Sequence, residues 1–158
     1  MRGAWWRQWF GGPGPGPGDA EALQGLLTRL YRQETALACH LAERARAVRF
    51  APHRRSLEVV AERDRQNAHT LAREIGCETA LAATAPPGRR PGTLTATKLI
   101  RDLEETEDLS ALYRQAGRLT SDVTLRDKLE GLAADEARGS QTIRAILARM
   151  DSNVTDLP

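Results

Sequence analysis

The chain has 158 residues and a formal net charge of +2 at pH 7, so it is long enough for one domain with a hydrophobic core. A charge this close to neutral gives no reason to expect nucleic acid or an anionic membrane as the partner. The sequence has no apolar run long enough for a transmembrane helix and only two cysteines, too few for a disulfide framework in a chain of this length. A cytoplasmic protein is expected.

The first 18 residues differ sharply in composition from the rest. Residues 1–10 read MRGAWWRQWF and residues 11–18 read GGPGPGPG, in which alternating proline and glycine is typical of a semi-flexible spacer. Because Trp and Arg are common at binding hot spots and membrane interfaces, the segment from Trp5 to Phe10 is a candidate docking peptide for a protein or surface partner. The alternative is a disordered terminus without a partner.

Two amphipathic helices are expected in the first half of the remaining chain. The first begins at Asp19, a suitable N-cap, and extends to about residue 49, because the residues before Pro52 leave the helical conformation. The second covers about 53–75 and ends at Gly76.

Two further helices are expected after a long break. One begins at Thr93 or Thr95 and reaches about residue 119, and the last follows the polar residues 120–122 and reaches about 150. Residues 151–158 form a tail, so the domain covers 19–150. No alternating pattern predicts a strand, so the expected fold is all-α.

The lengths of the connections predict the topology. Short connections make the first and second helices one antiparallel hairpin and the third and fourth another. The middle connection has about 17 residues, which reach roughly 55–60 Å when extended, whereas a helix over 53–75 is roughly 35 Å long. We therefore expect a long crossover between the two hairpins of a four-helix bundle. The alternative is an up-down-up-down bundle with a loose middle loop.

One acidic residue interrupts the predicted apolar face of each helix. The face of the first helix reads Leu23, Leu27, Leu30, Glu34, Leu37, Leu41, Ala45 and Val48, and the other helices place Asp64, Glu107 and Glu136 at similar depth. An ionised carboxylate in a core costs several kcal/mol unless it has a partner. Four such residues that converge in a bundle are candidate metal ligands.

The two predicted hairpins also resemble each other. An offset of 72 residues places Asp64 on Glu136, and an offset of 73 places Glu34 on Glu107. Apolar positions match in both alignments, but any two amphipathic helices align in this way. The matched acids are the informative feature of the repeat.

Residues 20–150 resemble the ferritin-like superfamily, and rubrerythrin-like proteins in particular. The resemblance rests on the segments LYRQE, LEVVAERDRQNAH, LEETEDLSALYRQA and LAADEARGSQTI. It implies a di-metal centre of Fe or Mn that takes one Glu from each of two helices and Glu-x-x-His from each of the others. Glu34 and Glu107 match the single glutamates, while Asp64 and Glu136 begin the paired motifs.

The chain departs from this pattern at both histidines. Asn67 and Gly139 stand in their places, where Asn67 could offer an amide oxygen and Gly139 is expected to leave a void. An all-oxygen site would suit Mn, Mg, Ca or weakly bound Fe. In the other interpretation the metal is lost and the acids take up protons or pair with arginine, with Arg114 as the best candidate.

Two functions follow from these alternatives. The first is a ferritin-like protein with a degenerate carboxylate metal site, acting in metal or oxidative-stress handling. The second is a non-enzymatic helical interaction module whose Trp-rich tag docks a partner. A homodimer is expected in either case, and whether the protein is an enzyme stays open.

Other polar residues are weaker candidates. Tyr31 lies on the same face as Glu34 and is expected to be a core residue or a hydrogen-bond partner of a ligand. His69 lies about 140° around the helix from Asp64, so it is not expected to share a metal with it. If that register is wrong, Gln66-x-x-His69 becomes the degenerate motif. His40 is expected at the surface.

Overall fold

The computed structural model describes residues 17–77 and 94–155, and every regular element within these ranges is an α-helix. The helices are α1 (Pro17–Ala47), α2 (Ala51–Glu74), α3 (Ala96–Leu119) and α4 (Val123–Thr155). The predicted all-α, four-helix fold is confirmed. The tag from Trp5 to Phe10 lies outside the described residues.

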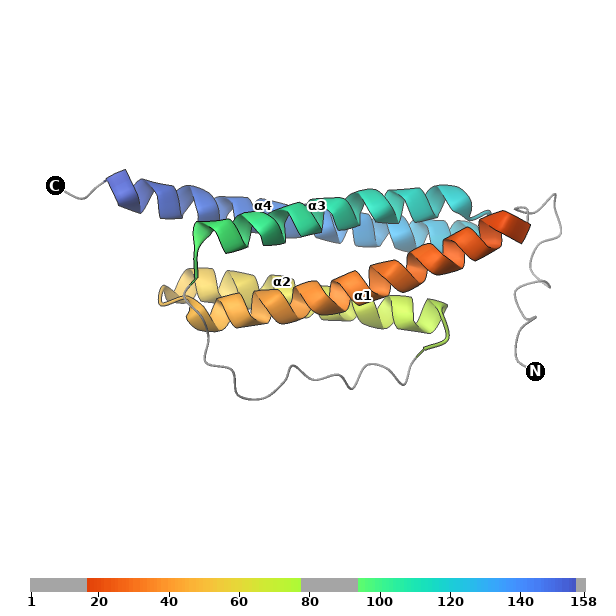
Figure 1. Cartoon of the computed structure of the whole chain (residues 1–158), viewed down its shortest axis with the longest axis horizontal. Coiled ribbons are helices and arrows are strands. Elements are labelled where there is room, and N and C mark those ends of the chain that lie inside the picture. The colour runs from red at the N-terminus through yellow and green to blue at the C-terminus, as the bar shows by residue number, and fades with distance from the viewer. Residues whose placement is uncertain (1–16, 78–93, 156–158) are drawn as a thin grey trace.

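The helices form two hairpins that pack against each other. α1 lies along α2 and α3 along α4, and the hairpins meet through α1 against α3 and α2 against α4. Figure 1 shows α2 and α3 pointing in the same direction, so the end of α2 and the start of α3 lie at opposite ends of the bundle. The predicted crossover between two antiparallel hairpins is therefore confirmed, although residues 78–93 themselves are not described.

Local sequence signals set the helix ends. Pro52 lies in the first turn of α2, where a missing N–H costs nothing. Gly76 follows α2 with φ +69°, and the Cys77 N–H donates to the Ala72 carbonyl at 2.8 Å, which is a glycine-dependent C-terminal cap. The side chain of Thr95 accepts from the Lys98 N–H at 3.3 Å and caps α3.

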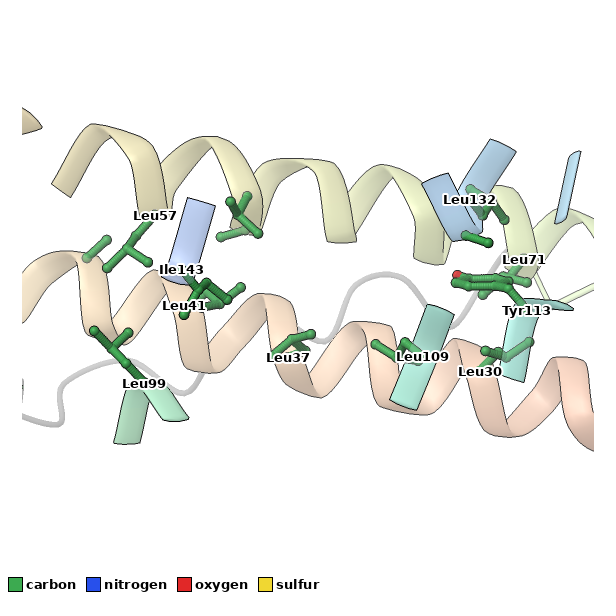
Figure 2. Packing of buried hydrophobic residues seen from close by; sticks show 14 of the residues in the cluster. Leu30, Leu37, Leu41, Leu57, Leu71, Leu99, Leu109, Tyr113, Leu132 and Ile143 are labelled. Atoms are coloured by element: carbon green, nitrogen blue, oxygen red, sulfur yellow. The ribbon is translucent and has the colours of Figure 1, made fainter. Parts of the chain in front are cut away.

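The apolar faces predicted for three of the helices are the buried faces of the bundle. On α1, α2 and α4 the leucines at these positions are at most 8% exposed, apart from partly buried residues near the helix ends. Figure 2 shows side chains from all four helices in this core, including Leu30, Leu41, Leu57, Tyr113 and Ile143. The same predicted faces carry Glu34, Asp64 and Glu136 into the interior.

The apolar face that the sequence predicts for α3 is wrong; it contains Ala96, Ile100, Leu103, Glu107 and Ser110. Ile100 is 47% exposed, whereas Leu99, Leu109 and Tyr113 are at most 1% exposed. The buried face advances by three and four residues from Leu99 to Tyr113, which matches the helical period and places more apolar volume in the core than the predicted face does. Asp102 and Thr106 are the polar residues on it.

Candidate metal centre

Three carboxylates from three helices meet inside the bundle. Glu34 on α1, Asp64 on α2 and Glu136 on α4 are each at most 1% exposed. Each can offer one carboxylate oxygen so that all three atoms lie within 4.8 Å of one another. The structure thus brings together three of the four acids predicted as ligands.

Two neutral side chains orient these carboxylates. The Tyr113 hydroxyl on α3 donates a hydrogen bond to Glu34 Oε1, and Asn67 Nδ2 on α2 donates to Glu136 Oε1 at 2.8 Å. With the carboxylates ionised, one buried oxygen of each accepts no hydrogen bond in the described structure: Glu34 Oε2, Asp64 Oδ2 and Glu136 Oε2. Buried polar atoms are seldom left without a hydrogen-bond partner. We therefore expect protons or a cation beside these oxygens.

Burial and mutual repulsion hold protons on this cluster. Burial, reinforced by the charges of Glu136 and Asp64, raises the pKa of Glu34 to about 10. Burial and the Glu136 charge raise the pKa of Asp64 to about 8. Burial raises the pKa of Glu136 to about 7, against the effect of hydrogen bonds from Glu34 and Asn67. Without a metal, the cluster therefore retains protons at neutral pH.

Glu107 does not belong to this cluster, contrary to the sequence prediction. Its side chain is 44% exposed, and it pairs with Arg144 on α4. The cause is the register of α3, which turns Thr106 inward and its neighbour Glu107 outward. Arg114, proposed as a buried partner for the acids, is also exposed.

Tyr113 is the residue that sequence reasoning missed. It is completely buried and contacts the centre from α3, whereas Tyr31, the tyrosine that was considered, is only partly buried. The spacing of Leu99, Leu109 and Tyr113 was a usable signal, because these are large residues on one helical face. The structure confirms that Asn67 is close to the acids, while His69 is exposed.

Gly139 leaves no void, contrary to expectation. A Cβ atom at this position would lie 3.3 Å from Val60 Cγ1 and 3.5 Å from Thr106 Cγ2. Side chains of α2 and α3 therefore already contact the position that the first atom of any side chain here would occupy. Glycine allows this close helix contact, and a histidine at this position would require Val60 or Thr106 to move.

Gly139→His should accordingly destabilise the protein by about 1–3 kcal/mol, the usual cost of overpacking a core. Gly131→His is the matched control, because a Cβ at Gly131 meets nothing within 4 Å. Urea unfolding of both variants measures the difference. Equal free energies of unfolding would contradict the close packing described for Gly139.

A second group of polar residues joins α1 to α3. His40 Nδ1 lies 3.7 Å from Glu105 Oε2, and Arg44 Nε lies 3.1 Å from Asp102 Oδ2. His40, Asp102 and Glu105 have metal-ligand spacing, but the Arg44 guanidinium supplies the positive charge that Asp102 needs. We interpret this group as an interhelical ion-pair network.

No protein-family model, curated protein or solved structure matches the chain. Among the described helices, none combines the length and apolar character needed to cross a membrane. The resemblance to ferritin-like proteins thus stays a prediction, and the geometry of the carboxylates carries the functional argument.

Proposed function

We propose that this chain is a ferritin-like four-helix protein that binds metal between Glu34, Asp64 and Glu136 and acts in metal or oxidative-stress handling. The observation that carries the proposal is the set of three buried carboxylates, each with an unpartnered oxygen. Carboxylate oxygens on the facing helices of a bundle are a common ligand set for Mn, Mg, Ca and Fe.

Arginine pairing, the competing explanation for the four acids, is found for the exposed Glu107, which pairs with Arg144. In the described structure no salt bridge joins an arginine to the three buried acids, and Arg63 pairs with Asp135. The remaining ways to satisfy the centre are protons and a cation. Both are compatible, because a cation would displace the protons that the metal-free centre retains.

The surrounding residues fit a metal centre. Tyr113 fixes Glu34 and Asn67 fixes Glu136 through hydrogen bonds to one oxygen, which leaves the other oxygen of each carboxylate for the ion. Such outer contacts orient ligands and strengthen metal sites. A bound divalent ion would offset two of the three carboxylate charges and be shielded from water, as suits storage, sequestration or a structural role.

Metal binding should be measurable as added stability. Protein purified without chelator should contain Mn or Fe, and Mn²⁺ at about 100 times its Kd should stabilise the fold by about 2.7 kcal/mol. Elemental analysis and thermal unfolding test this. Glu34→Gln should abolish the stabilisation, whereas Glu107→Gln, at an exposed position, should leave it intact.

A metal-free preparation that shows no thermal shift with Mn²⁺ or Fe²⁺ would rule the proposal out. The interaction module would then be the better hypothesis. It predicts that deleting residues 1–18 abolishes binding to the partner while the bundle stays folded.

A further inference from the structure

We infer that the centre takes one oxygen-liganded divalent cation, and not the pair of ions that the ferritin-like resemblance implies. This inference rests on the proposed metal binding and specifies the ligand class of the same site. It follows from the geometry of the carboxylates, from their total charge and from the absence of nitrogen ligands.

The geometry fits a single ion. Ligand oxygens lie about 2.3–2.6 Å from Ca²⁺, so two ligands of one such ion are at most about 5 Å apart. One oxygen each from Glu34, Asp64 and Glu136 meets this condition, because the three atoms lie within 4.8 Å of one another. A second ion about 3.5–4 Å away would need ligands of its own.

The centre lacks the charge for a second ion. Two divalent cations carry four positive charges, whereas Glu34, Asp64 and Glu136 supply at most three negative ones. The fourth carboxylate would have come from α3, but Glu107 faces solvent and Tyr113 contributes a neutral hydroxyl that donates to Glu34. A buried pair of ions would retain one uncompensated positive charge, which is costly, whereas a single ion leaves one negative charge that a retained proton neutralises.

The ligand types favour a hard cation. The cluster of candidate ligands contains no histidine or cysteine, and Val60 and Thr106 fill the space beside Gly139. Oxygen ligands suit Mg²⁺, Ca²⁺ and Mn²⁺. Because the carboxylates are at most 1% exposed and Mg²⁺ gives up its waters reluctantly, Mn²⁺ and Ca²⁺ are the better fits.

Titration of the full-length protein with Mn²⁺ tests the inference, with native mass spectrometry for stoichiometry and electron paramagnetic resonance for the environment of the ion. We expect one tightly bound Mn²⁺ per chain with the spectrum of an isolated ion, and displacement by Ca²⁺. Two Mn²⁺ per chain with a spin-coupled spectrum would overturn the single-ion inference and still support metal binding. No bound Mn²⁺ would overturn both.

Variants assign the ion to this centre. Glu34→Gln should weaken Mn²⁺ binding by more than about 100-fold, because loss of an outer contact alone costs about 10–100-fold. Tyr113→Phe removes one such outer contact and should weaken Mn²⁺ binding by about 10-fold. Glu107→Gln should leave the affinity for Mn²⁺ unchanged. Circular dichroism confirms that each variant is folded. A single Mn²⁺ that survives Glu34→Gln, or is lost with Glu107→Gln, would contradict the assignment.

Discussion

Raising the pH from about 5 to about 9 should destabilise the metal-free protein by several kcal/mol. Glu34, Asp64 and Glu136 have folded-state pKa values of about 10, 8 and 7, all above the usual carboxyl values of 4.5 and 3.8. The folded state therefore holds more protons than the unfolded state. Each extra proton makes the free energy of unfolding fall by about 1.4 kcal/mol per pH unit.

The pH range over which stability is lost follows from the same pKa values. The loss begins at about pH 3.8–4.5, where the unfolded chain releases its protons, and is steepest from there to about 7, where Glu136 ionises. It then weakens as Asp64 ionises near 8 and ends near 10 with Glu34. Below the unfolded values the full stability is present, since both states are protonated.

Urea unfolding in the presence of EDTA at several pH values measures this dependence. Glu107→Gln should keep the slope, because Glu107 is exposed. A variant with Glu34→Gln, Asp64→Asn and Glu136→Gln together should lose most of it. Wild-type stability that stays constant or rises between about pH 5 and 8 would contradict the buried, protonated state of the cluster.

The sequence predicted the helices and three of the four convergent acids for one physical reason. On α1, large leucines recur at Leu27, Leu30, Leu37 and Leu41 on both sides of Glu34. These residues fix the rotation of the helix, so the acid between them has to enter the core. The faces of α2 and α4 fixed Asp64 and Glu136 in the same way.

The rotation of α3 could not be predicted in this way, because two different faces of this helix carry apolar residues. Leu103 is partly buried and Ser110 is buried, and both lie on the predicted face with Glu107. The observed face includes the polar residues Asp102 and Thr106, which weaken its apolar signal. The match of Glu107 to Glu34 in the repeat favoured the wrong register, one residue away from the correct one.

The contacts that complete the centre depend on distances between helices that no single-helix pattern contains. Tyr113 is 79 residues from Glu34 and Asn67 is 69 residues from Glu136. The close approach of Gly139 to Val60 and Thr106 likewise depends on how three helices pack. A void at Gly139 was expected because only its own helix was considered.

The double substitution Asp64→Asn with Glu136→Gln should stabilise the metal-free protein at about pH 9 by about 1–4 kcal/mol, the gain often seen when buried ions are replaced by neutral groups. Asp64 and Glu136, with pKa values of about 8 and 7, are the residues ionised at this pH. Glu34→Gln alone should also stabilise the metal-free protein at this pH, because folded Glu34, with a pKa of about 10, holds a proton there that the unfolded chain has released.

Saturating Mn²⁺ should reverse this order of stability. Wild-type protein should gain about 3 kcal/mol or more, whereas the double variant, without two of its three carboxylates, should gain nothing. Thermal unfolding of both proteins in EDTA and in Mn²⁺ at about pH 9 gives the comparison, and wild-type protein that gains no more stability from Mn²⁺ than the double variant does would contradict a metal role. Natural proteins often carry a stability cost where a functional site requires it. Without a cation, the three acids in the core destabilise the folded state as the pH rises. If Mn²⁺ makes the wild type the more stable protein, metal binding explains why these acids are buried.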